Sequence, residues 1–398
     1  MNITTLQCNS TVEIYLLSKL CTEGSELSKY ECVKSYTPMT DAVRQVSGLW
    51  LLLVGIIGIF GNVVTLSTIP YAARKRRYGL DKNYYTTTIF ILHLAFIDLM
   101  HSILIVVPLG ILYSSSSSPF GKYGCKLIIY GGVTTLVASM LAISLVALSR
   151  CLDMVITSTW TAFCDKKRNI LCLFLIVWIP SLIALVISLI IQSYGIEPGW
   201  HCETGGCGFI RPCENSKDSD RYIDDLHDIK SCHEGDEIWR LTYFSTICVP
   251  AVSLGIAAVS YILIWCKVHR STKYLLGTEQ LQVVEQVAPQ LYHRDTKMTM
   301  TILILITLNF LFWLPYGVLI NTALDLTKKP KQSTPEQYIL KVILVSIFET
   351  QYAINFFVYV ARHKQYRNAF LDAFPFSGRK RKRSKQSNRK RSGHENEN

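Results

Sequence analysis

Residues 125–150 have the sequence CKLIIYGGVTTLVASMLAISLVALSR, with no charged side chain between Lys126 and Arg150. A helix needs about 20 mostly apolar residues to cross a hydrocarbon core of roughly 30 Å, because each residue rises about 1.5 Å. The stretch is therefore long enough to span a membrane. The composition agrees, since 49% of the 398 residues are hydrophobic and only 18% are charged.

Six further segments share this length and apolar character, so the sequence predicts an all-α membrane protein folded as a seven-transmembrane helix bundle. No internal repeat is apparent, which argues against the paired broken helices of many transporters. We expect the spans near residues 47–72, 84–112, 124–152, 169–193, 239–266, 297–324 and 339–361.

Charged residues between the spans predict their orientation, because Lys and Arg are retained on the cytoplasmic side. The first, third and fifth connections and the carboxyl-terminal tail carry basic residues, for example Arg74–Arg77 and Arg379–Arg383. The fourth connection, residues 194–238, is rich in Asp and Glu. The amino terminus is therefore predicted to be extracellular, in a protein of the plasma membrane.

Cysteines and glycosylation sequons agree with this orientation, since disulfides persist only in oxidising compartments. Eight of the thirteen cysteines lie on the predicted outside, as do the sequons that begin at Asn2 and Asn9. The other five lie in spans or cytoplasmic connections and are expected to be free thiols: Cys151, Cys164, Cys172, Cys248 and Cys266.

The chain after the last span is expected to lie on the membrane. Tyr366, Phe370 and Phe374 fall four apart, on one face of an amphipathic helix. The basic run 379–391 contributes to a net charge of +12, but it follows seven spans, so it should contact anionic lipids and no nucleic acid. We expect an extracellular amino-terminal segment, a transmembrane domain, an amphipathic juxtamembrane helix and a basic disordered cytoplasmic tail, over residues 1–46, 47–361, 362–375 and 376–398.

Motifs in successive spans carry a family resemblance. Cys125, at the outer start of span three, precedes Arg150 by twenty-five residues. The remaining motifs are Gly61-Asn62-Val63-Val64, Leu94-Ala95-Phe96-Ile97-Asp98, Trp178, Pro250, Phe312-Trp313-Leu314-Pro315-Tyr316 and Asn355-Phe356-Phe357-Val358-Tyr359. In this order they resemble the motifs of rhodopsin-like (class A) G-protein-coupled receptors. Residues 355–370 and the patterns of spans three to six also resemble the invertebrate moody and trapped-in-endoderm group of orphan receptors.

Asp98 in span two is the first candidate site residue. A carboxylate in the middle of a bilayer costs at least about 2.5–3.5 kcal/mol, so Asp98 should face the bundle interior and find polar partners. The candidate partners are Asn62, Ser139 and Asn355. The resemblance implies that such oxygens hold a sodium ion, and the alternative is a hydrogen-bond node without an ion.

The resemblance implies that Arg150, at the cytoplasmic end of span three, couples the receptor to a G protein. Ser149 replaces the acidic residue that usually precedes this arginine. Asp295, at the base of span six, is expected to pair with Arg150 at rest and to release it on activation. Asp153 is an alternative partner, and in a further alternative Arg150 snorkels to the membrane surface while Asp295 is solvated.

Further switch residues are also implied by the resemblance. Pro315 should kink span six, because proline supplies no amide hydrogen and clashes with the preceding turn. Trp313 resembles the family's toggle residue, although ordinary aromatic core is the alternative. Tyr261 and Tyr359 complete the set, whereas Phe356 stands where the family usually has proline, which suggests altered activation coupling.

The ligand cavity is expected between the outer halves of the helices. The resemblance argues against a monoamine ligand, because Gly132 occupies the position of the amine-binding aspartate, and against retinal, because Glu349 occupies the position of the retinal-binding lysine. Glu349 should bind a cationic ligand group or pair internally with His101. The weaker cavity candidates are Thr135, Tyr316, Asn321 and Tyr352.

The long fourth connection is implied by the resemblance to be joined to Cys125 by a disulfide bond, with Cys232 best placed for it. The acidic residues of this connection steer a basic peptide or are simply solvated. The connection could also cover the cavity and favour a lipid that enters from the bilayer.

The sequence thus predicts a receptor that converts binding of an extracellular ligand into activation of a heterotrimeric G protein, with arrestin as a further partner. A peptide or lipid ligand is favoured over a monoamine. We expect no enzymatic activity and no cofactor other than the sodium ion. The alternatives are a receptor-like protein with weak G-protein coupling and a transporter.

Overall fold

The computed structural model describes residues 38–74, 82–115, 120–164, 166–193, 197–201, 206–210, 248–267, 269–270, 300–318, 335–362, 367–368 and 370. Within these residues, seven helices are long and apolar enough to cross a membrane, which confirms the predicted all-α bundle of seven spans. In chain order, spans one to seven are Ala42–Pro70, Thr88–Ser114, Tyr123–Val155, Lys167–Ile190, Cys248–Lys267, Met300–Val318 and Ile339–Arg362.

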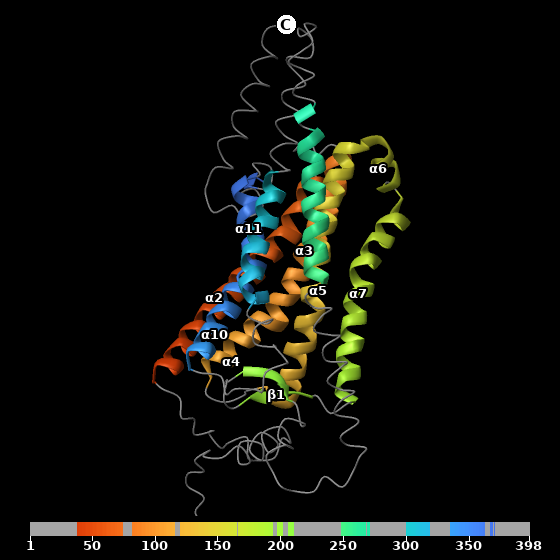
Figure 1. The fold of residues 1–398 in the computed structure, drawn as a ribbon. Helices are drawn as coiled ribbons and strands as arrows, with labels where there is room; N and C mark the ends of the chain where they lie inside the picture. Colours follow the sequence, from red (N-terminus) through yellow and green to blue (C-terminus); the bar gives the residue numbers. More distant parts are fainter. Residues whose placement is uncertain are drawn as a thin grey trace, which may run out of the picture.

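Most spans belong to helices that extend beyond the apolar region. Spans one, three and four lie in α2 (Pro38–Arg74), α5 (Gly121–Val155) and α7 (Lys167–Ser193). The short helix α6 (Thr157–Cys164) connects α5 with α7. Span seven divides at Thr350 into α10 (Pro335–Glu349) and α11 (Gln351–Arg362). Figure 1 shows α2 and α7 on opposite sides of the bundle, with α5 between them.

Span two contains a local change of helix type. It begins as α3 (Lys82–His101), continues as the π-helix η2 (Ser102–Val106) and ends as α4 (Val107–Ser114). Pro108 lies in the first turn of α4, where it supplies no amide hydrogen and its ring crowds the carbonyl of Leu104. The amide of Val107 accordingly reaches back five residues to the Ser102 carbonyl, which widens the turn.

Span three forms the centre of the bundle. Two-thirds of its most apolar window (67%) is buried within the protein, against 17% for span four. The helix α5 packs against α3, η2, α6 and α7. A residue of α5 therefore contacts several other spans at once, so polar side chains on this helix can connect them.

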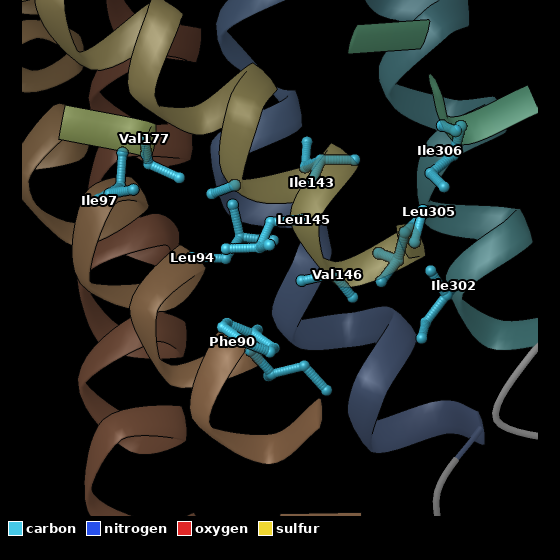
Figure 2. Packing of buried hydrophobic residues seen from close by; sticks show 14 of the residues in the cluster. Phe90, Leu94, Ile97, Ile143, Leu145, Val146, Val177, Ile302, Leu305 and Ile306 are labelled. Carbon is cyan, nitrogen blue, oxygen red and sulfur yellow. The ribbon is translucent and has the colours of Figure 1, made fainter. Parts of the chain in front are cut away.

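The main hydrophobic core joins spans two, three and six. Ile302, Leu305 and Ile306 follow the spacing of one helix face, and Figure 2 shows them directed toward α5. Val146 of α5 and Phe90 of α3 belong to the same cluster. This apolar layer lies beside the half of span three that the sequence predicts to be cytoplasmic.

Two short strands in the fourth connection were not predicted. The strands β1 (Glu197–His201) and β2 (Gly206–Ile210) form an antiparallel hairpin that packs against α4, α5 and α7. Figure 1 shows the hairpin at the end of the bundle where α2 begins and α4 ends. Glu197–His201 lacks an alternating apolar pattern, and in Gly206–Ile210 the apolar Cys207 and Phe209 alternate with glycine, which is depleted in strands.

Cys125 is disulfide-bonded in this structure. The five cysteines predicted to be free thiols, from Cys151 to Cys266, form no disulfide bond with a described residue. Cys232 lies outside the described residues, so its pairing with Cys125 stays a prediction. The same holds for Asp295, Asn321, Asn2 and Asn9, and for all of the expected amphipathic helix except residues 362, 367–368 and 370.

Candidate functional site

Asp98 is fully buried and connects three spans. Asn355 of α11 donates a hydrogen bond from Nδ2 to Asp98 Oδ2 over 2.6 Å. Ser139 of α5 donates from Oγ to Asp98 Oδ1 over 3.2 Å. Each carboxylate oxygen thus has a donor from a different helix, which offsets the cost of burying the acid.

Asn62 was expected to bind Asp98, but the structure places its amide elsewhere. Its Nδ2 atom donates to the carbonyl of Gly58 over 2.9 Å and to the carbonyl of Tyr352 over 3.1 Å. Both amide hydrogens are therefore used on backbone acceptors. Asn62 holds span one against span seven, next to the Asp98 node rather than within it.

The oxygen atoms around Asp98 also bear on an ion site. Among the described residues, no three His, Cys, Asp or Glu side chains gather as they would around a transition metal. Asn355 Oδ1 is buried and accepts no hydrogen bond from the described residues. Carboxylate, hydroxyl and amide oxygens are ligands that suit a hard cation.

A second buried polar cluster joins the same three spans closer to the hairpin. His101 Nε2 lies 2.8 Å from Glu349 Oε2, and His101 Nδ1 lies 2.6 Å from Thr135 Oγ1. The side chains of His101 and Glu349 are only 2% and 7% exposed. Of the two roles considered for Glu349, the structure therefore has the internal pair with His101.

An aromatic column lies beside this cluster. The ring of Tyr352 stacks on His101 with centroids 3.6 Å apart, and Phe348 meets Tyr352 edge to face at 6.1 Å. Tyr316 of span six stacks on Phe348 at 4.4 Å, and Trp313 is buried in the same cluster. The column thus connects the aromatic residues of span six to His101 in span two.

Phe348 did not emerge from the sequence as a site residue. Its spacing of four residues from Tyr352 places the two side chains on one helix face, which was an available signal. What the sequence lacked was the position of Tyr316 on the neighbouring span.

Arg150 lies buried near the other end of α5, paired with an acid on its own helix. Its Nη1 atom is 3.4 Å from Asp153 Oδ2, and both side chains are 3% exposed. Arg150 also acts electrostatically on Tyr261 of span five. Ser149 is fully buried, and its hydroxyl has no hydrogen-bond partner among the described residues. Ser149 therefore does not take over the role of an acidic neighbour, whereas Asp153 contacts the guanidinium.

Other polar contacts between spans were also not predicted. Trp178 Nε1 donates to His93 Nε2 over 2.9 Å, between spans four and two. Ser144 donates to the carbonyl of Ser253 over 2.9 Å, between spans three and five. The signal for His93 was present, because a polar residue inside an apolar span requires a partner.

Span five is also held to the end of α5. The Lys267 ammonium group donates to the carbonyl oxygens of Met154 and Val155, the last two residues of α5. A cation at a helix carboxyl terminus satisfies free carbonyls and interacts favourably with the helix dipole. Tyr359, another expected switch residue, is buried in the main core.

Comparisons with known proteins identify the class of the protein. The family described as 7 transmembrane receptor (rhodopsin family) matches residues 61–359, and the chain belongs to this family. The crystal structure of squid rhodopsin is similar, with a TM-score of 0.57 and 17% sequence identity over 88% of this chain and 92% of that chain. No curated protein matches the sequence. Family membership indicates a multi-pass membrane protein that signals through a G protein.

Proposed function

We propose that this receptor lies in the plasma membrane with its amino terminus outside, and that it activates a heterotrimeric G protein when a peptide or lipid ligand binds between the outer halves of its spans. The observation that carries the proposal is the burial of Arg150 with Asp153 near the end of α5 remote from the hairpin. A buried arginine with a weak partner on its own helix is a group that a change in packing can release.

The pair of Arg150 and Asp153 makes this proposal testable. The Asp153→Asn substitution keeps the shape of the side chain but removes its charge, so it should weaken the hold on Arg150 and raise basal G-protein activation. The Arg150→Ala substitution should reduce activation sharply. G-protein dissociation in intact cells, corrected for surface expression, measures both effects. Glu336→Gln, at an exposed acid near the start of α10, is the control for loss of one negative charge. If Arg150→Ala activated the G protein as well as the wild type, the assigned switch would be wrong.

The orientation rests on the charges of the connections and on the sequons at Asn2 and Asn9. An epitope added before Met1 should be stained in intact cells, and glycosidase treatment should increase the mobility of the wild type but not of the Asn2→Gln/Asn9→Gln variant. Staining only after permeabilisation would reverse the proposed orientation.

The pairing of Glu349 with His101 supports a ligand that has no cationic group, because the Glu349 carboxylate already has a partner. This favours a lipid, or a peptide held by the outer surface, over an amine. A screen of lipid, peptide and amine libraries against the wild type and Glu349→Gln tests this proposal. An amine agonist that loses potency in Glu349→Gln would contradict it.

Asp98, Ser139 and Asn355 are the residues that would hold a sodium ion, which would supply a positive charge to stabilise the resting bundle. The support is the set of oxygen ligands and the buried Oδ1 atom of Asn355. External sodium should lower agonist affinity in the wild type and have no effect in Asp98→Asn. If agonist affinity in the wild type did not depend on sodium, Asp98 would form a hydrogen-bond node without an ion.

Arrestin and anionic lipids are further proposed partners at the cytoplasmic face, the lipids through the basic run 379–391. Weak G-protein coupling is the second candidate, and the observation that favours it is Ser149, which is buried without a partner among the described residues. Ser149→Asp should then change the coupling efficiency at equal surface expression. Equal efficiency in this variant and the wild type would remove the support for weak coupling.

A further inference from the structure

The short distances within the cluster of His101, Glu349 and Thr135 determine which of its nitrogen and oxygen atoms carry a hydrogen. Thr135 Oγ1 lies 2.6 Å from the carbonyl oxygen of Gly131. Two oxygens at this separation require a hydrogen between them, and a carbonyl has none to give. Thr135 therefore donates its single hydroxyl hydrogen to the carbonyl oxygen of Gly131.

Because the Thr135 hydrogen is donated to Gly131, the protonation of the His101 imidazole follows. Thr135 Oγ1 has no second hydrogen, so it can only accept a hydrogen bond from His101 Nδ1 at 2.6 Å. His101 must carry a proton on Nδ1. The contact of 2.8 Å between His101 Nε2 and Glu349 Oε2 needs a second hydrogen, which is held by the nitrogen or by the carboxyl group. Either way the pair of side chains is neutral overall and retains one shared proton.

Both side chains are almost fully buried, so water cannot replace the shared hydrogen in this contact. Without it, the Nε2 lone pair would face a carboxylate in a site where both side chains are almost fully buried. The contact between the two side chains therefore depends on the shared hydrogen.

Separation would affect span seven more than span two. Glu349 is the last residue of α10, directly before the break at Thr350. Tyr352, in the first turn of α11, stacks on His101 at 3.6 Å, so the imidazole contacts span seven on both sides of the break. Thr135 fixes the same ring to span three, the central helix.

We propose that His101 is a positioning residue for signalling, which holds span seven in its resting arrangement through one proton shared with Glu349, and that activation requires this hydrogen bond to break. The inference rests on the proposed function for its link to activation, but not for the proton. It assigns Glu349 to an internal contact between spans two, three and seven.

The proton is tested on the wild-type full-length chain, labelled with nitrogen-15 histidine and reconstituted in lipid nanodiscs. Magnetic resonance should show a His101 Nδ1 that carries a proton and a Nε2 in a strong hydrogen bond, and these signals should be absent in His101→Gln. A His101 Nδ1 without a proton would overturn the proposal. This result does not depend on signalling, so it separates failure of the inference from failure of the proposed function.

The link to activation is tested with paired substitutions. The double variant His101→Phe/Glu349→Leu replaces both partners by apolar groups, which spares the fold an unpaired buried charge. It should raise basal G-protein activation about fivefold or more at equal surface expression. The exchange variant His101→Glu/Glu349→His should return basal activation toward the wild type, though not fully, because a carboxylate at position 101 cannot donate to Thr135.

His93 provides the matched control. It lies on the same helix, is also buried and bonds to Trp178 instead of an acid. His93→Gln keeps an acceptor for Trp178 and should leave basal activation unchanged. Wild-type basal activation in the apolar double variant, or an equal rise in His93→Gln, would overturn the link between His101 and activation.

Discussion

The seam between α2 and α4 allows a quantitative test of the packing. Gly110 of α4 faces α2 so closely that a Cβ atom there would lie 2.8 Å from the backbone nitrogen of Leu52 and 3.1 Å from the carbonyl oxygen of Gly48. These are backbone atoms, which cannot move aside as a flexible side chain can. The Gly110→Ala substitution must therefore push the two helices apart.

Two effects set the expected change in stability. Overpacking a close contact costs about 1–3 kcal/mol, whereas alanine is favoured over glycine in a helix by about 1 kcal/mol. The net loss in Gly110→Ala should be up to about 2 kcal/mol of unfolding free energy. Gly255 in span five is the matched control, because a Cβ atom there would have no neighbour within 4 Å in the described part of the chain. Gly255→Ala should retain the helix benefit and gain about 0.5 kcal/mol or more.

The two variants differ from the wild type by the same methyl group, so their comparison removes the chemical effect of the substitution. Thermal unfolding of the purified full-length protein in detergent, followed by tryptophan fluorescence, should give a lower midpoint for Gly110→Ala and an equal or higher one for Gly255→Ala. Gly48→Ala, whose Cβ atom would lie 2.6 Å from the Ser114 nitrogen, should behave like Gly110→Ala. Equal midpoints for Gly110→Ala and Gly255→Ala would refute the close approach of α2 and α4.

Three further substitutions test contacts between spans. Asn355→Leu removes the donor to Asp98 at 2.6 Å and should lower unfolding free energy by roughly 1–3 kcal/mol, measured by thermal unfolding; an unchanged midpoint would contradict the buried hydrogen bond. Lys267→Met keeps the side-chain length but removes the cation at the end of α5. Backbone amide hydrogens in the turn that follows α5 should then exchange faster with solvent. Unaltered exchange would count against the contact. Trp50→Phe removes the 3.2 Å bond to Thr350 and should cost about 0.5–1.5 kcal/mol. In a Thr350→Val background, Trp50→Phe should cause no further loss of unfolding free energy. If the losses from the two substitutions simply added, Trp50 and Thr350 would not be coupled.

Several features followed from the sequence because they depend on local properties. The seven spans are set by the transfer free energy of apolar segments, and the structure confirms them. The burial of Asp98 and its need for partners followed from the cost of a carboxylate in the membrane, and two of its three expected partners bond to it. The lack of disulfide bonds at five cysteines among the described residues followed from their positions relative to the spans.

Span two shows a limit of local reasoning. Its length and apolar character predicted one continuous helix, whereas the chain changes to a π-helix over Ser102–Val106. Pro108 predicts a disturbance, but neither the type of turn nor the direction of the His101 side chain that precedes it follows from hydropathy. That direction depends on how span two is rotated against its neighbours.

The partner of Glu349 was decided by tertiary structure alone. From the sequence, Glu349 was equally suited to a ligand and to His101, and 248 positions separate the two residues that the structure pairs. Arg150 had Asp153 and Asp295 as candidates. The structure places Asp153, on the same helix, 3.4 Å from Arg150, while Asp295 lies outside the described residues and its pairing stays a prediction. Composition and periodicity determine that a segment crosses the membrane and which residues need partners. The rotation and depth of each helix arise only from side-chain packing between spans, which the sequence of one span does not contain.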